Sequence, residues 1–383
     1  MEATPAYSEV VAAYAQAAGA RATWLVRARD AAEVIAKAGM LGVHDRLVAF
    51  SEAPSPRHAE LFRWQTVTVV DELTPEAFIQ GSAGVDAAAQ ERARLVSEGS
   101  PASYAHPAGM SSDRLFWLLP SVGGAQLRVA DLRAFARAAQ EHGALLMVDN
   151  TEPTVFGCHP LALGAHVCLE ELAPMADAPL AEPVLAVSVA RSLGRRGHRK
   201  LADPRAEDAF RLLTFAFGAP DAAVPACMPT GESLGIVARS LDTLAARMQP
   251  RFDGAHAVAA YLACHPAVGS VRYPALATHP DHALAPTVLE HGFGPVVALS
   301  LTGTDREPML VRHSHAAQAF QRAYAAQTAG QGAGSPAFPA TRTVPTVDAK
   351  TSMLRLYMGT EDPLAIVDSL DQALRLFCNP PEP

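Results

Sequence analysis

One segment in the first half of the chain sets the fold class. Between Val129 and Gly143, apolar residues recur at the i, i+3, i+4 and i+7 spacing of one helix face. Gly143 is a suitable helix end, and the five apolar residues of 144–148 that follow indicate a buried strand. Asp149 comes directly after that strand. A helix, a glycine, a buried strand and an acid in this order predict an α/β domain with a mostly parallel sheet.

Further elements are expected on both sides of this segment. Asp30 and Glu33 form a capping box that predicts a helix reaching Met40. A change of character beyond residue 230 predicts two domains, a large one over 1–245 and a smaller α/β domain over 246–383. The other expected elements are strands at 46–50, 66–70, 115–119, 268–273 and 295–301, and helices at 233–248, 256–264 and 363–377.

Composition excludes several classes of protein. The 383 residues include 49% apolar ones, enough for two globular cores, and the formal charge of −8 argues against a nucleic-acid or acidic-membrane partner. No apolar run approaches the ~20 residues of a membrane span, and the first residues lack a signal-peptide pattern. The five cysteines are scattered without a CxxC pair, so no disulfide framework and no metal site are expected, and a reducing cytoplasm is the predicted location.

Several stretches share one resemblance. They are 127–132, 142–151, 159–165 and 257–262, the pairs His265-Pro266, Tyr273-Pro274 and His279-Pro280, and 353–362. Together they resemble the Cys/Met-metabolism family of pyridoxal-phosphate enzymes, which includes cystathionine γ-synthase and the cystathionine lyases. The resemblance implies the type I pyridoxal-phosphate transferase fold, also called aspartate-aminotransferase-like. It also implies pyridoxal phosphate as cofactor, transsulfuration chemistry, and a homodimer or homotetramer.

The resemblance also assigns site residues. It places Asp149 against the pyridinium nitrogen of the cofactor, and the end of a parallel strand is where such sheets bind ligands, although Asp-Asn also forms plain turns. It implies that Arg355 binds the α-carboxylate of the substrate, a role that suits a planar guanidinium. The alternative is that Arg355 is an ordinary surface arginine on an edge strand. Ser335, in the Gly-rich loop 328–339, is expected on the substrate side.

The Schiff-base lysine is where the pattern breaks. The family motif Ser-x-Thr-Lys matches best at Ser188, which puts Arg191 at the lysine position and needs an insertion of about 17 residues. Aligned without the insertion, the position is Pro174. Neither side chain forms an imine, since a guanidinium with a pKa above ~12 is not a usable amine nucleophile. Of 31 basic residues three are lysines, and only Lys200 is near in sequence, where it would serve after a loop rearrangement.

Other cofactor contacts are also replaced. Asp30 falls at the phosphate-binding helix start, where its charge competes with a phosphate for the same amides. Ser55 takes the place of the stacking tyrosine, and Ala190 that of the motif threonine. The N-terminal arm falls at or before residue 1, so a truncated arm is expected. A degenerate pyridoxal-phosphate site is therefore predicted, with Asp149, Ser188 and Arg191 as its remaining cofactor-binding residues.

Three functions follow as alternatives. The first is a diverged homologue without Schiff-base catalysis, a pseudoenzyme that binds an amino-acid-like ligand or regulates an active paralogue. The second is an active C–S lyase or γ-replacement transferase on sulfur amino acids or homoserine esters, with Lys200 as a relocated lysine. The third is an anion-binding scaffold that uses the basic run 191–200, although such a run is equally typical of a solvated loop.

Overall fold

A computed structural model describes most of the two expected domains. The described residues are 5–37, 41, 45–51, 66–83, 114–191, 193–196, 199–202, 204–223, 227–302, 318, 320–322, 324–325, 343–347 and 353–378. Everything below refers to these residues.

A seven-stranded sheet forms the large domain. Its spatial order is β1-β9-β8-β7-β4-β2-β3, and β9 is the one antiparallel member. The mostly parallel α/β sheet predicted from the sequence is therefore confirmed. The strands are β1 (Ala22–Arg27), β2 (Arg46–Phe50), β3 (Thr66–Val70), β4 (Leu115–Pro120), β7 (Ala144–Asp149), β8 (Val167–Glu171) and β9 (Val184–Val189).

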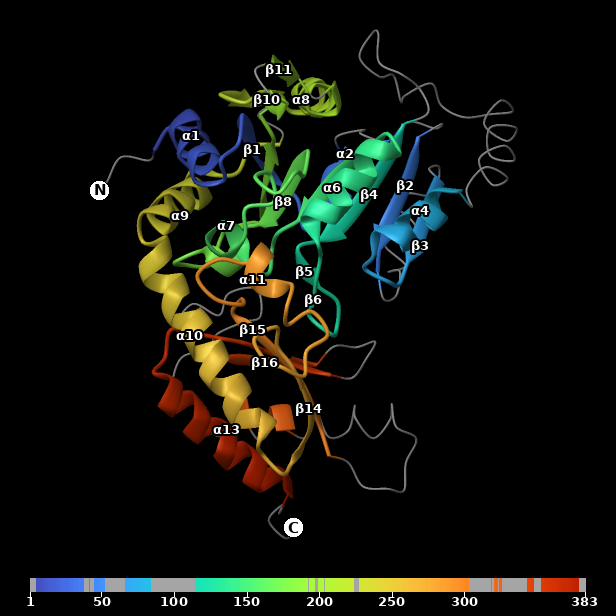
Figure 1. The fold of residues 1–383 in the computed structure, drawn as a ribbon. Coiled ribbons are helices and arrows are strands. Elements are labelled where there is room, and N and C mark those ends of the chain that lie inside the picture. Colours follow the sequence, from blue (N-terminus) through green and yellow to red (C-terminus); the bar gives the residue numbers. More distant parts are fainter. Residues whose placement is uncertain are drawn as a thin grey trace, which may run out of the picture.

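Helices pack on this sheet in two groups, each with its own hydrophobic core (Figure 1). One core joins β1, β8 and β9 to α1 (Tyr7–Ala17), α2 (Ala31–Lys37), α8 (Pro204–Phe217) and α9 (Gly231–Asp242). The other joins β4 and β7 to α4 (Pro75–Ala83) and α6 (Leu132–Glu141), with Trp117 and Phe135 fully buried in edge-to-face contact. The strands buried between these layers read as continuous apolar runs, because both of their faces are covered.

A second sheet builds the smaller domain. Its order is β14-β15-β17-β16, all antiparallel, and α10 and α13 lie beside it (Figure 1). Its core is separate from those of the large domain. The elements are α10 (Leu244–Ala263), β14 (Val268–Arg272), β15 (Val296–Leu301), β16 (Val344–Val347), β17 (Leu354–Tyr357) and α13 (Pro363–Cys378).

Short elements complete the described part of the chain. They are β5 (Val122–Gly123), β6 (Arg128–Val129), α7 (Thr154–Gly157), the 3₁₀ turn η1 (Ala173–Met175), β10 (Leu193–Arg196), β11 (Arg199–Ala202), β12 (Gly218–Ala219), β13 (Ala222–Ala223) and α11 (Ala285–Val288).

The prediction of helices at 233–248 and 256–264 is wrong. The structure ends α9 at Asp242 and begins α10 at Leu244, and α10 then continues through Pro250 to Ala263. A proline inside a helix removes one backbone donor, which is why the sequence suggested a break there. Burial of Met248 and Phe252 on the same helix outweighs that loss. The domain boundary at 245/246 stays a prediction.

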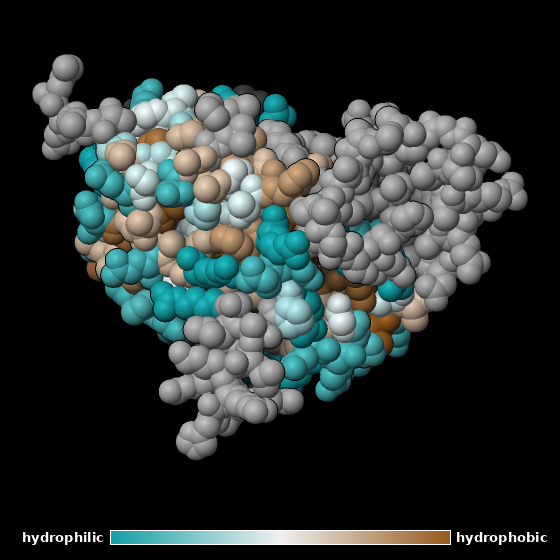
Figure 2. Space-filling view, turned by 90° about the horizontal axis from the view of Figure 1, so that it is seen from above, coloured by the Kyte–Doolittle hydropathy of each residue, from teal (hydrophilic) through white to brown (hydrophobic). Residues whose placement is uncertain are grey.

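The described surface mixes polar and apolar residues, as the view in Figure 2 shows for one face. Among the described residues, the large hydrophobic side chains with high exposure are Val69, Phe215 and Leu364, on three different elements. None of the described helices is long and apolar enough to cross a membrane. The apolar residues that the structure describes are thus used mainly in the cores.

Candidate functional site

A cavity of about 220 Å³ opens where β7 and β8 end. This is the carboxyl edge of the parallel strands, the place where open α/β sheets bind ligands. The charged side chains that line it are Asp30, Asp149, Glu152, Glu171 and Arg355. The structure thus brings together Asp149 and Arg355, the two residues that the sequence assigned to cofactor and substrate.

Asp149 is the last residue of β7 and is held by the turn that follows. Its Oδ1 accepts a hydrogen bond from the backbone N–H of Thr151 at 3.0 Å. Burial raises the pKa of Asp149, and the hydrogen bonds from Thr151 oppose that shift. The carboxyl group is therefore fixed by the backbone before any ligand arrives.

Arg355 reaches the cavity from the small domain. On β17 its neighbours Leu354 and Leu356 are buried in the small-domain core, so the alternation of a strand turns Arg355 the other way. Its Nη2 lies 2.6 Å from Oε1 of Glu152, and its guanidinium lies over the ring of Tyr357. The predicted carboxylate-binding arginine is thus already in contact with a carboxylate of this chain.

The lining carries four carboxylates and one guanidinium. Burial is the largest cause that raises the pKa of Glu171 to about 7, and the negative charges of Asp149, Asp30 and Glu152 raise it further. Burial also raises the pKa of Glu152, an effect that Arg355 opposes. The negative charges of the carboxylates therefore repel one another, and the described lining favours a ligand group with positive charge over one with negative charge.

Asp30 occupies the start of α2, as its capping role predicted. Its Oδ1 accepts from the backbone N–H of Glu33 at 2.8 Å, and the Glu33 carboxylate accepts from the N–H of Arg29 at 3.1 Å. An amide at this helix start is therefore already bound to a carboxylate of the chain.

Ser188 and Arg191 do not reach this cavity. Because β9 is antiparallel, its chain runs toward the amino ends of the parallel strands, with Val189 paired to Val167. Arg191 is exposed and lies four residues beyond Val187, which is level with Leu169 and Asp149; that is about 13 Å along the strand. The alignment that put Arg191 at the lysine position, and with it a cofactor role, is corrected by this topology.

Ser188 faces the opposite side of the sheet. Its hydroxyl shares a 2.8 Å hydrogen bond with that of Thr23, and it lines a different cavity from Asp149. Its expected cofactor role is therefore corrected too.

Pro174 lies three residues after the end of β8, beyond the carboxyl edge of the sheet. It lies in η1, after the strand whose end carries Glu171. Its backbone oxygen accepts from Nη1 of the buried Arg251 at 2.5 Å. The alignment without an insertion is thus the one that matches the order of elements, and it puts proline at the lysine position.

Lys200 belongs to β11, which pairs with β10 beyond the end of β9. This hairpin lies near α8, away from α7 and β5 at the carboxyl edge (Figure 1). The side chains of the basic run 192–200, and Ser335 and Ser55, lie outside the described residues.

The described cavity does not fit pyridoxal phosphate. A phosphate would meet four carboxylates, a helix start capped by Asp30, and an arginine paired with Glu152. None of the described lining residues carries a primary amine. No reaction step through this cofactor follows from the geometry.

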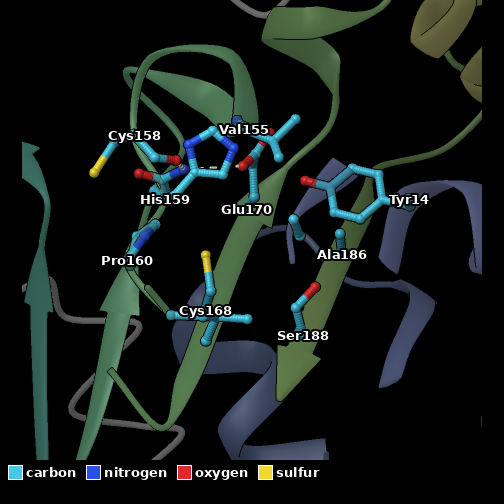
Figure 3. A pocket seen from close by; sticks show the side chains of 12 residues that line it. Tyr14, Val155, Cys158, His159, Pro160, Cys168, Glu170, Ala186 and Ser188 are labelled. Carbon is cyan, nitrogen blue, oxygen red and sulfur yellow. Dashed lines mark hydrogen bonds between the residues drawn. The ribbon is translucent and has the colours of Figure 1, made fainter. Parts of the chain in front are cut away.

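A second, smaller cavity of about 10 Å³ lies on the other face of β8 (Figure 3). Glu170 is buried there and accepts from the N–H of Val155 at 3.0 Å and from Nδ2 of Asn150 at 3.2 Å. The Tyr14 hydroxyl faces the same space (Figure 3). Desolvation raises the pKa of Glu170 to about 8, against the effect of these hydrogen bonds.

Sequence reasoning missed three of these carboxylates, Glu152, Glu170 and Glu171. The available signal was their position, because each follows the apolar run of a strand that ends at the edge marked by Asp149.

Comparisons with known proteins agree with the fold. Residues 227–375 match the family described as "Cys/Met metabolism PLP-dependent enzyme". Cystathionine gamma-lyase of Sus scrofa is 28% identical over 262 residues, 65% of this chain and 57% of the relative. Cystathionine gamma-synthase of Mycobacterium tuberculosis is 27% identical over 278 residues, 68% of this chain and 62% of the relative. The chain thus matches less than two thirds of the length of these relatives.

Two solved structures show the architecture. Apo CalE6, a methionine gamma lyase from Micromonospora echinospora, superposes with a TM-score of 0.68 at 20% identity, over 96% of this chain and 86% of its own. Cystathionine gamma synthase from Xanthomonas oryzae pv. oryzae gives 0.69 at 21%, over 97% and 85%. The predicted resemblance and the type I fold are confirmed, and the matched family is a pyridoxal-phosphate-dependent one.

Proposed function

We propose that this chain, similar to the cystathionine γ-lyases and γ-synthases, is a diverged homologue that binds an amino-acid-like ligand without Schiff-base catalysis. One observation carries the proposal: Pro174 lies three residues after β8, beyond the carboxyl edge, where the resemblance requires a lysine. Proline offers no side-chain amine that could attack a carbonyl.

The charges of the cavity support an amino-acid ligand. Arg355 is suited to a carboxylate, which a guanidinium binds with two parallel hydrogen bonds. Asp149 and Glu171 line the same cavity and are suited to an ammonium group. A zwitterion would satisfy both ends of the site, whereas a phosphate would meet mainly carboxylates.

Cofactor trapping tests the proposal. Purified protein is titrated with pyridoxal phosphate, reduced with borohydride and mapped by peptide mass. We expect no cofactor on Lys37, Lys200 or Lys350 beyond the level of a surface-lysine control protein. The variant Pro174→Lys places an amine on the loop after β8, and circular dichroism checks that it folds.

Specific labelling of Lys200 in the wild-type chain would overturn the proposal. It would restore the active C–S lyase or transferase, with a relocated lysine and a rearranged β10–β11 hairpin. The predicted homodimer or homotetramer and the association with an active paralogue stay predictions, for which light scattering of the purified protein is the measurement. The cytoplasmic location also stays a prediction.

A further inference from the structure

The ion pair between Glu152 and Arg355 joins the two domains across the candidate cavity. The residues are 203 positions apart in the chain, and their side chains are 21% and 15% exposed. The 2.6 Å contact between Nη2 and Oε1 is that of a charge-assisted hydrogen bond. One carboxylate of the chain therefore occupies the guanidinium that the proposed function assigns to the ligand.

The local backbone holds Glu152 in this place. Asp149 fixes the turn before it by accepting from the N–H of Thr151, and Thr154 closes the next turn by donating to the carbonyl of Asn150 at 3.0 Å. Glu152 lies inside the second of these turns, so its side chain starts from a defined position beside the cavity. The contact is built by the end of β7 rather than by a free surface chain.

We infer that Glu152 is an internal competitor for the ligand carboxylate at Arg355, an autoinhibitory contact that a ligand must displace. The inference rests on the proposed function, since it describes the regulation of the same site. A ligand carboxylate takes over the guanidinium only when Glu152 swings away, so the measured affinity is lowered by the fraction of molecules in which the pair is closed.

The displaced Glu152 carboxylate stays near Asp149 and Glu171, which both line the cavity. A ligand that brings only a carboxylate leaves this negative charge uncompensated. A ligand that also brings an ammonium group compensates it. The contact therefore selects zwitterionic amino acids over simple carboxylates of the same shape.

Two probes and two variants test this inference by isothermal titration calorimetry at neutral pH. The probes are L-methionine and 4-(methylthio)butanoate, which is methionine without its amine. The variant Glu152→Gln removes the competitor, and Glu171→Gln removes the same charge from the same cavity without touching the contact with Arg355. Circular dichroism confirms that both variants fold.

We expect Glu152→Gln to bind L-methionine about tenfold more tightly than the wild type, the gain for a pair that is closed about nine times in ten. Glu171→Gln is expected to bind it no more tightly, and the butanoate is expected to bind the wild type more weakly than L-methionine. Equal affinity of Glu152→Gln and wild type, or an equal gain in Glu171→Gln, would overturn the competitor while leaving the proposed function in place. Absence of L-methionine binding in the wild type and in Glu152→Gln would overturn both.

Discussion

Glu170 and Glu171 are neighbours on β8, yet they belong to two different kinds of environment. Successive strand residues point to opposite faces, so Glu170 lines the cavity of about 10 Å³ and Glu171 lines the cavity of about 220 Å³. Glu170 is 1% exposed and accepts two hydrogen bonds from Val155 and Asn150. Glu171 lies among other carboxylates. Its backbone N–H donates to the hydroxyl of Thr151, and among the described residues its carboxylate takes no part in that bond.

This difference separates structure from ligand binding. A buried carboxyl group with donors in place stabilises the fold, because removing it leaves those donors unpaired in a dry interior. A carboxyl group that lines the larger cavity among like charges destabilises the free protein and is useful when a cation arrives. Glu170 is therefore expected to serve the fold, and Glu171 the ligand.

Removing each side chain should give the largest contrast. Glu170→Ala leaves the N–H of Val155 without an acceptor and removes one of the two acceptors of Asn150 Nδ2, so we expect a loss of about 2–4 kcal/mol in the free energy of unfolding. Glu171→Ala relieves repulsion among the lining carboxylates, so it should leave the free energy of unfolding unchanged or raise it. Urea unfolding followed by circular dichroism measures both, and similar losses in the two variants would refute the assignment of roles.

The pH dependence of stability sharpens the comparison. The folded state raises the pKa of Glu170 to about 8 and that of Glu171 to about 7, from an ordinary 4.5. Between these limits the folded protein holds more protons than the unfolded chain, so the free energy of unfolding falls as pH rises from about 5 to about 9.

The variant Glu170→Gln isolates one part of this dependence, on the order of 5 kcal/mol over that range, because glutamine does not titrate. Urea unfolding at several pH values should give a flatter profile for Glu170→Gln than for the wild type. Parallel profiles would show that Glu170 is not protonated in the folded state. Glu171→Gln is expected to flatten the profile less, since Glu171 is less deeply buried.

The sequence predicted most of the sheet but only part of the site. The strands at 46–50 and 66–70 have the predicted bounds because alternation and flanking turns are local signals. The 184–189 strand was missed, since its serine was matched to a catalytic motif and an apolar run carries no information on strand direction. Arg191 and Ser188 were placed wrongly for that reason.

Local sequence signals also explain which residues of the site were predicted and which were not. Asp149 and Asp30 were found because each begins or ends a regular element. Glu152 was missed because its partner, Arg355, is 203 residues away, and no local pattern records such a contact. Glu170 was missed because an acid on a strand usually faces water, and only the packing of α1 over β8 and β9 shows that this one is buried.

The smallest expected effect comes from the edge of the Glu170 network. Ser121 donates its hydroxyl to Oδ1 of Asn150 at 2.8 Å, which leaves Nδ2 directed at Glu170. We expect Ser121→Ala to lower the free energy of unfolding by about 1 kcal/mol, the net value of one such bond.

Ser121→Ala also removes the donor that holds Oδ1 of Asn150, so the amide turns its oxygen toward Glu170 if it gives up the bond from Nδ2 to the carbonyl of Cys158. Glu170 then gains an acceptor for its proton. The pKa of Glu170 would rise, so the loss of stability with pH should continue to a higher pH in Ser121→Ala than in the wild type. Unfolding profiles of both proteins against pH test this, and superimposable profiles would mean that Ser121 does not orient Asn150.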